Sequence, residues 1–165
     1  MEAQEALGKR SKKITEIPKP EVEAEQGAYR KKDGELFIPS RCVKACIVNA
    51  PAWYKFGRRS AKQFIAGGTR IEPYEIGLGT DKYEIDLRPV VIQRTSRVMR
   101  ARACLSEWKL KFNLVFNEDV IPDTEILKQI IEEAGIRIGL LDNRPQRGGE
   151  NGTFQISSWN GVKGD

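Results

Sequence analysis

The chain has no histidine among its 165 residues and only three cysteines. Histidine is the commonest general base and a frequent zinc ligand, so its absence argues against a nucleophilic triad and against the usual zinc sites. Cys42 and Cys46 lie four positions apart on a predicted helix, and Cys104 lies far along the chain. We interpret all three as small apolar residues of a reduced, cytosolic protein, and we expect no metal and no cofactor.

Long apolar runs are also missing, because no segment approaches the roughly 18 apolar residues that a membrane-spanning helix needs. No signal peptide is recognisable either. We therefore predict a cytoplasmic protein, in the host cytoplasm if the chain is viral, with no membrane partner. Acidic residues are outnumbered, 23 against 28 lysines and arginines, and the net charge of +5 favours a polyanionic partner.

Few carboxylates are grouped in a way that suggests catalysis. Glu84 and Asp86 share one face of a predicted strand and could pair around a metal, and Asp142 lies in a glycine-rich segment. Most such acids are solvated or pair with arginines. A metal-dependent nuclease is therefore our least favoured hypothesis, and we expect no enzymatic activity.

Charge and proline content divide the chain. Residues 1–27 mix lysine and arginine with glutamate, include Pro18 and Pro20, and contain few large apolar residues, which is typical of a flexible charged tail. Residues 28–160 are long enough for a single domain with a proper core. Residues 161–165 are predicted to form a disordered C-terminus.

Within the domain, hydrophobic periodicity predicts two helices and roughly four main strands. One helix covers residues 41–50 and the other runs from Pro122 to Gly135, where a glycine suits the C-terminal cap. Alternating apolar and polar residues mark the strands. The predicted strands cover residues 70–76, 83–93 and 98–105, and a fourth begins at Glu107 or Trp108 and ends at Phe116. A short hairpin over 29–38 and a final strand around Phe154 and Ile156 complete the prediction.

This order of elements indicates an α+β fold. We predict an RRM-like or ferredoxin-like antiparallel sheet with two helices on one face, a glycine-rich loop before the last strand, and a long hairpin within residues 90–114. The other face of such a sheet is available to a partner, and here it would carry several basic side chains.

Residues 136–159 form the glycine-rich, arginine-bearing segment IRIGLLDNRPQRGGENGTFQISSW. Gly148 and Gly149 let a backbone pass close to another group, since glycine has no Cβ. Arg144 and Arg147 add fixed positive charges that match phosphate well. The segment is either a polyanion site or a long structural connection.

Basic residues interleaved with aromatics occur in two further runs, an arrangement typical of proteins that hold single-stranded nucleic acid. The aromatic members are candidates for base stacking or, alternatively, core residues, and they are Trp53, Tyr54, Phe56 and Trp108. The basic members are candidate phosphate contacts or a solvated rim, and they are Lys55, Arg58, Arg59, Lys62, Arg94, Arg97, Arg100, Arg102, Lys109 and Lys111.

Three short motifs carry a resemblance to a known family. The Leu-Phe-Ile-Pro-Ser of residues 36–40, followed by the helix over 41–50, resembles the start of proteins of the RAMP superfamily, the RRM-like subunits that form the backbone of CRISPR effector complexes. Residues 139–154 are similar to the glycine-rich loop after the last helix in that superfamily. Arg88-Pro89-Val90-Val91, together with Arg144-Pro145, is similar to a group of small phage proteins of that fold.

The resemblance implies an RRM-like core that binds one nucleic-acid strand, often as a head-to-tail multimer. The chain is much shorter than the large backbone subunits and lacks the histidine of the family's RNA-processing nucleases. Both departures favour a small binding protein of a phage or mobile element.

Two leading hypotheses follow. The first is a non-enzymatic, sequence-tolerant protein that binds single-stranded DNA or RNA and forms a homo-oligomer. The alternative is a phage structural or host-defence-inhibiting protein that acts through protein–protein contacts. The basic and aromatic residues favour the first.

Overall fold

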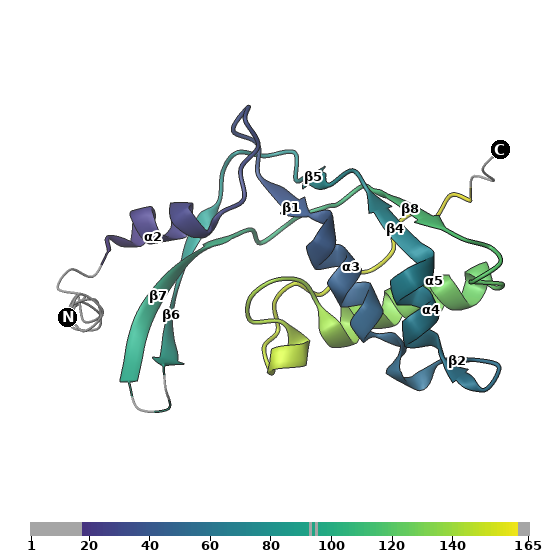
Figure 1. Cartoon of the computed structure of the whole chain (residues 1–165). Helices are drawn as coiled ribbons and strands as arrows, with labels where there is room; N and C mark the ends of the chain where they lie inside the picture. The colour runs from purple at the N-terminus through teal and green to yellow at the C-terminus, as the bar shows by residue number, and fades with distance from the viewer. Residues whose placement is uncertain (1–17, 93, 95, 162–165) are drawn as a thin grey trace, which may run out of the picture. The chain divides into compact units, whose positions relative to one another are not determined.

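The computed structural model describes residues 18–92, 94 and 96–161 (Figure 1). It is an α+β structure of helices and small antiparallel sheets, so the α+β part of the predicted fold class is confirmed. The described residues divide into two compact units, where the sequence predicts one domain. We call residues 18–28 and 82–107 the hairpin unit, and residues 29–81 and 108–161 the core unit.

The hairpin unit is built on two long antiparallel strands, β6 (Glu84–Ile92) and β7 (Ser96–Cys104). Alternating residues predict both strands, but the hairpin they form lies earlier in the chain than the predicted range of 90–114. Helix α2 (Pro20–Gly27) lies against β7 in Figure 1. A segment predicted to belong to the flexible tail is thus helical, while residues 1–17 and 162–165 lie outside the described residues.

On each outer edge of the hairpin, the row of free backbone N–H groups is interrupted near the middle of the strand. The backbone N–H of Ala101 in β7 donates to Glu23 Oε2 (3.1 Å) and therefore points away from β6. Ala101 and Leu87 are therefore a non-hydrogen-bonded pair of the antiparallel ladder. Met99 and Pro89 lie two positions further along their strands and form a pair of the same kind. The nitrogen of Pro89 therefore faces the outer edge of β6. Because that nitrogen does not face β7, the missing N–H of proline removes no hydrogen bond between the two strands.

The core unit combines short strands with three helices. Strand β1 (Phe37–Pro39) pairs antiparallel with β5 (Glu75–Gly77), and β4 (Thr69–Glu72) pairs antiparallel with β8 (Asn113–Phe116). A tight hairpin joins β2 (Lys55–Phe56) and β3 (Arg59–Ser60). The helical segments are α3 (Ser40–Asn49), η1 (Pro51–Trp53), α4 (Ala61–Gly68), α5 (Thr124–Glu133), the π-helical η2 (Ala134–Ile138) and the 3-10 turn η3 (Pro145–Arg147).

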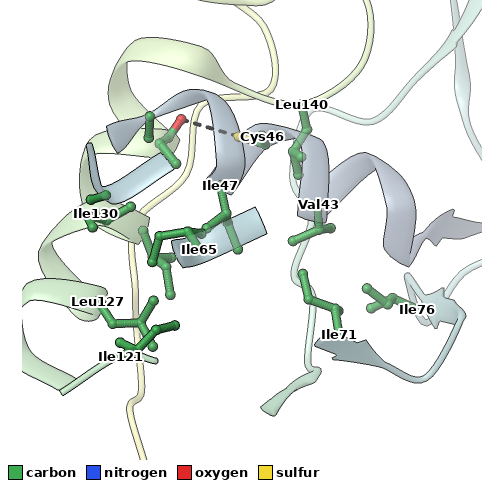
Figure 2. Close-up of a cluster of buried hydrophobic side chains, with 14 of the residues drawn as sticks. Val43, Cys46, Ile47, Ile65, Ile71, Ile76, Ile121, Leu127, Ile130 and Leu140 are labelled. Atoms are coloured by element: carbon green, nitrogen blue, oxygen red, sulfur yellow. Dashed lines mark hydrogen bonds between the residues drawn. The ribbon is translucent and has the colours of Figure 1, made fainter. Parts of the chain in front are cut away.

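Apolar side chains from these helices, from strands β4 and β5 and from the adjoining loops form the core, as Figure 2 shows. Ile47 of α3, Ile65 of α4 and Ile130 of α5 are completely buried. Each such side chain contributes about 1.5–3 kcal/mol by leaving water. Cys46 lies in the same cluster, where its Sγ donates to Ala134 O (3.4 Å) and burial raises the pKa of its thiol to about 12. It is therefore an apolar core residue, as predicted.

Three local predictions are wrong. The sequence predicts two helices, whereas the described residues contain four, because α2 and α4 were not predicted. The predicted final strand around Phe154 and Ile156 is irregular backbone. The predicted strand from Glu107 or Trp108 to Phe116 shrinks to β8, although half-buried and exposed residues still alternate along the whole of that segment.

Candidate nucleic-acid interface

The glycine-rich loop after η2 is held together by its own backbone. Leu140 N donates to Gly152 O (2.9 Å), and Asn151 N donates to Asn143 O (2.9 Å). A Cβ at Gly149 would lie 2.0 Å from Asn143 O, and one at Gly152 would lie 2.0 Å from Leu140 O. These glycines are therefore required by the packing of the loop itself, and they need no ligand to explain them.

The two arginines of this loop have different surroundings. Arg144 is half-buried and folds back on the loop, with its Nη1 donating to Leu141 O (2.8 Å) and its Nε donating to Gln146 Oε1 (3.2 Å). Arg147 is exposed at the end of η3. The N–H groups of Arg147, Gly148 and Gly149 all donate to carbonyls within the loop. Arg147 is thus the loop residue best placed to contact a phosphate.

In the hairpin unit, Glu23 of α2 forms ion pairs with two of the arginines that are predicted to contact phosphate. Arg100 Nη1 lies 3.0 Å from Glu23 Oε1, and Arg102 Nη1 lies 3.5 Å from the same oxygen. Arg102 also donates to Ala101 O. The hydrogen bond from the Ala101 N–H, followed by that from Arg100, lowers the pKa of Glu23. The remaining predicted arginines of the hairpin, Arg94 and Arg97, are exposed near its turn.

The clearest group of unpaired cations lies on β2, β3 and the first turn of α4. Lys55, Arg58, Arg59 and Lys62 are all exposed, and none forms an ion pair within the part of the chain that the structure describes. Gly57 adopts a φ of 62° at the turn and so allows the hairpin to close tightly. We call these four residues the basic hairpin.

The basic hairpin belongs to a stretch without acids. Residues 36–71 contain no aspartate or glutamate and seven lysines and arginines. The spacing of basic residues does not reveal this signal, which lies in the absence of acidic residues from the segment. Such a local excess of one charge is a better indicator of a polyanion site than the net charge of the chain.

Lys44 of α3 fixes α4, the helix that follows the basic hairpin. Its Nζ donates to Ile65 O (3.1 Å), to Thr69 Oγ1 (2.5 Å) and to Thr69 O. It thus satisfies carbonyls at the C-terminal end of α4, where a positive charge is favourable. Burial lowers the pKa of this amine.

The predicted stacking residues face their own unit. The ring of Phe56 meets Phe64 edge-on, with centroids 5.5 Å apart and planes at 82°. Trp108 meets Phe154 in the same manner at 6.4 Å and 68°, and Tyr54 is half-buried against the core. The side chain of Trp53 lies outside the described residues. Lys109 and Lys111, close to Trp108 in the chain, are exposed.

The candidate carboxylates do not assemble into a metal site. Asp86 Oδ2 lies 2.5 Å from Arg88 Nε in an ion pair, and Glu84 is exposed. Among the described residues, no three side chains of the metal-binding types His, Cys, Asp and Glu are placed to hold one ion. Nothing in this geometry supports the nuclease hypothesis.

No protein-family model, curated protein or solved structure matches the chain. No helix in the described ranges is both long and apolar enough to cross a membrane.

Proposed function

We propose that this protein binds nucleic acid through the phosphate backbone, without sequence preference and without catalysis. The observation that carries the proposal is the basic hairpin, whose four exposed cations have no acidic partner among the described residues. An unpaired guanidinium on a tight turn can approach a phosphate and donate two hydrogen bonds to it. Arg147, Lys109 and Lys111 would extend the contact.

A single strand of DNA or RNA is the proposed ligand, and an RRM-like arrangement of strands in the core unit is part of the same proposal. The resemblance to the RAMP superfamily supports both. It also supports head-to-tail association of copies, since one small unit contacts only a few nucleotides. The similarity of Arg88-Pro89-Val90-Val91 and Arg144-Pro145 to small phage proteins supports the assignment to a phage or mobile element.

A titration with a charge-neutralising variant tests the proposal. Fluorescence anisotropy with a labelled single strand should show an affinity that falls linearly with salt on a log–log plot. Arg58→Gln together with Arg59→Gln should weaken binding and reduce the slope by about 1.4, since each phosphate contact contributes about 0.7. The matched control, Lys19→Gln with Lys32→Gln, removes the same charge from exposed positions outside the basic hairpin and should change the affinity much less. An absence of binding at low salt would overturn the proposal.

One observation favours the second candidate, a protein that acts through protein–protein contacts. The hairpin unit exposes several large apolar side chains, and an apolar surface of this kind suits a protein partner better than a phosphate backbone. These residues are Ile85, Leu87, Val90, Val91 and Met99, with exposed fractions from 38% to 57%. The apolar face below is formed by the four that share one side of the strand pair, Ile85, Leu87, Val91 and Met99, whereas Val90 points to the opposite side.

A further inference from the structure

The exposed aromatic residues of this protein differ from the predicted base-stacking residues. Where the structure describes an aromatic side chain, only Tyr29 and Tyr74 are exposed, at 37% and 57% of their surface. All other described aromatic side chains are half-buried. An aromatic ring that retains this much contact with water is available to stack on a ligand.

The backbone places both tyrosines beside the start of α3. The N–H of Ser40, the first residue of α3, donates to Tyr74 O (2.7 Å). Tyr29 O accepts from the N–H of Phe37 (3.0 Å), and the rings of these two residues lie 5.7 Å apart. Strand β1 and its neighbours therefore hold the two exposed rings at one end of α3.

Arg41, in the first turn of α3, links the two tyrosines electrostatically. The interaction of its guanidinium with the Tyr29 side chain, followed by that with Tyr74, raises the pKa of Arg41. Arg41 is exposed and belongs to the acid-free residues 36–71. A permanent cation at the start of α3 thus interacts with both exposed tyrosines of the core unit.

We propose that Tyr29, Arg41 and Tyr74 form a base-stacking site for single-stranded nucleic acid, in which a base lies on an exposed tyrosine ring and Arg41 contacts the adjoining phosphate. This inference rests on the proposed function and assigns the stacking contact to residues outside the basic hairpin. Stacking on aromatic rings together with backbone-tracking charge is how proteins hold single strands without reading their sequence.

This chemistry selects single strands over duplexes. In a duplex, each base is already stacked on its neighbours, so a tyrosine ring gains a base only if that stack opens. The phosphate contact of Arg41 is available in both forms. The tyrosines therefore supply the preference for a single strand, and the cations supply affinity for either form.

Substitution of the ring separates the two contributions. The probe is a labelled oligothymidylate of about 16 nucleotides, at the upper end of single-strand site sizes, with its duplex with oligoadenylate as the second ligand. Tyr74→Ala should raise the Kd for the single strand about tenfold, leave its salt slope unchanged, and leave the Kd for the duplex within twofold. Tyr74→Phe keeps the ring and should retain wild-type binding. Arg41→Gln should instead reduce the salt slope by about 0.7.

The possible results distinguish a failure of the stacking site from a failure of the proposed function. If wild-type protein binds the single strand but Tyr74→Ala and Tyr29→Ala bind it equally well, the stacking site is wrong and the proposed function stands. If Tyr74→Ala weakens single strand and duplex by the same factor, the tyrosine does not act by stacking, which also overturns the site. If wild-type protein binds neither ligand at low salt, the proposed function itself fails.

Discussion

The arginines and lysines of this chain differ in whether another residue already pairs with their charge. Arg100 pairs with Glu23, which lies 77 positions earlier in the chain, and Arg144 folds onto its own loop. Arg58 and Arg59 have no such partner in the described part of the chain. Spacing along the sequence predicts that all four are basic candidates, but only the folded chain shows which charges remain available for a ligand.

Lys44 provides a stability test at the same scale. Lys44→Met keeps the length of the side chain and removes the ammonium, which leaves the Ile65 and Thr69 oxygens without this donor. We expect the free energy of unfolding to fall by about 1–3 kcal/mol, the usual cost of leaving a buried polar group without its partner. Chemical denaturation measures the change. The exposed control Lys32→Met should stay within about 0.5 kcal/mol of the wild type, and equal values for the two variants would contradict the assigned role.

Amphipathic elements were predictable from the sequence, and short elements were not. The stripe of Leu127, Ile130 and Ile131 identifies α5, and Asp123 caps it by accepting from the N–H groups of the following turn, so sequence and structure agree there. Helix α4 is short and contains two glycines, and α2 buries only Ala24. Neither helix has enough buried apolar residues to show a helical period in the sequence. Both helices are stabilised by contacts with the rest of their unit.

Acid should weaken the contact between α2 and β7. Glu23 has a pKa below its ordinary value of 4.5, so the stability it contributes is present above that value and is lost as the pH falls through its lower, folded-state pKa. We expect the protection of the Ala101 amide against hydrogen exchange to be steady from about pH 7 to 5 and to fall below about pH 4. Glu23→Gln should remove this pH dependence. An identical loss of protection in that variant would show that other groups cause it.

At the scale of the whole molecule, the basic hairpin and the apolar face belong to different units. The core unit carries the basic hairpin and the exposed tyrosines, whereas the hairpin unit carries the apolar face. This division is compatible with a protein that holds a polyanion with one unit and contacts another protein chain with the other. The sequence did not predict the division, because residues 18–28 and 82–107 are far apart in the chain and only folding brings them together.

The apolar face should drive association of copies. Leu87 and Met99 lie on the same side of the strand pair, in pairs that are two positions apart in the register. Leu87→Ser together with Met99→Ser should lower the concentration-dependent molar mass measured by light scattering, while binding of a single strand by the monomer stays within twofold. If wild-type protein remains a monomer with and without a long oligonucleotide, association through this face is wrong.

The interrupted edges of the β6–β7 hairpin have a consequence for what can add to it. Growth of a cross-β fibre requires a new strand to pair along a free edge, one N–H and one C=O after another. Pro89 breaks that row of donors on β6, and Glu23 occupies the donor of Ala101 on β7. A protein that exposes this much apolar surface on a hairpin can therefore meet partners side chain to side chain while remaining protected against templating its own fibrils.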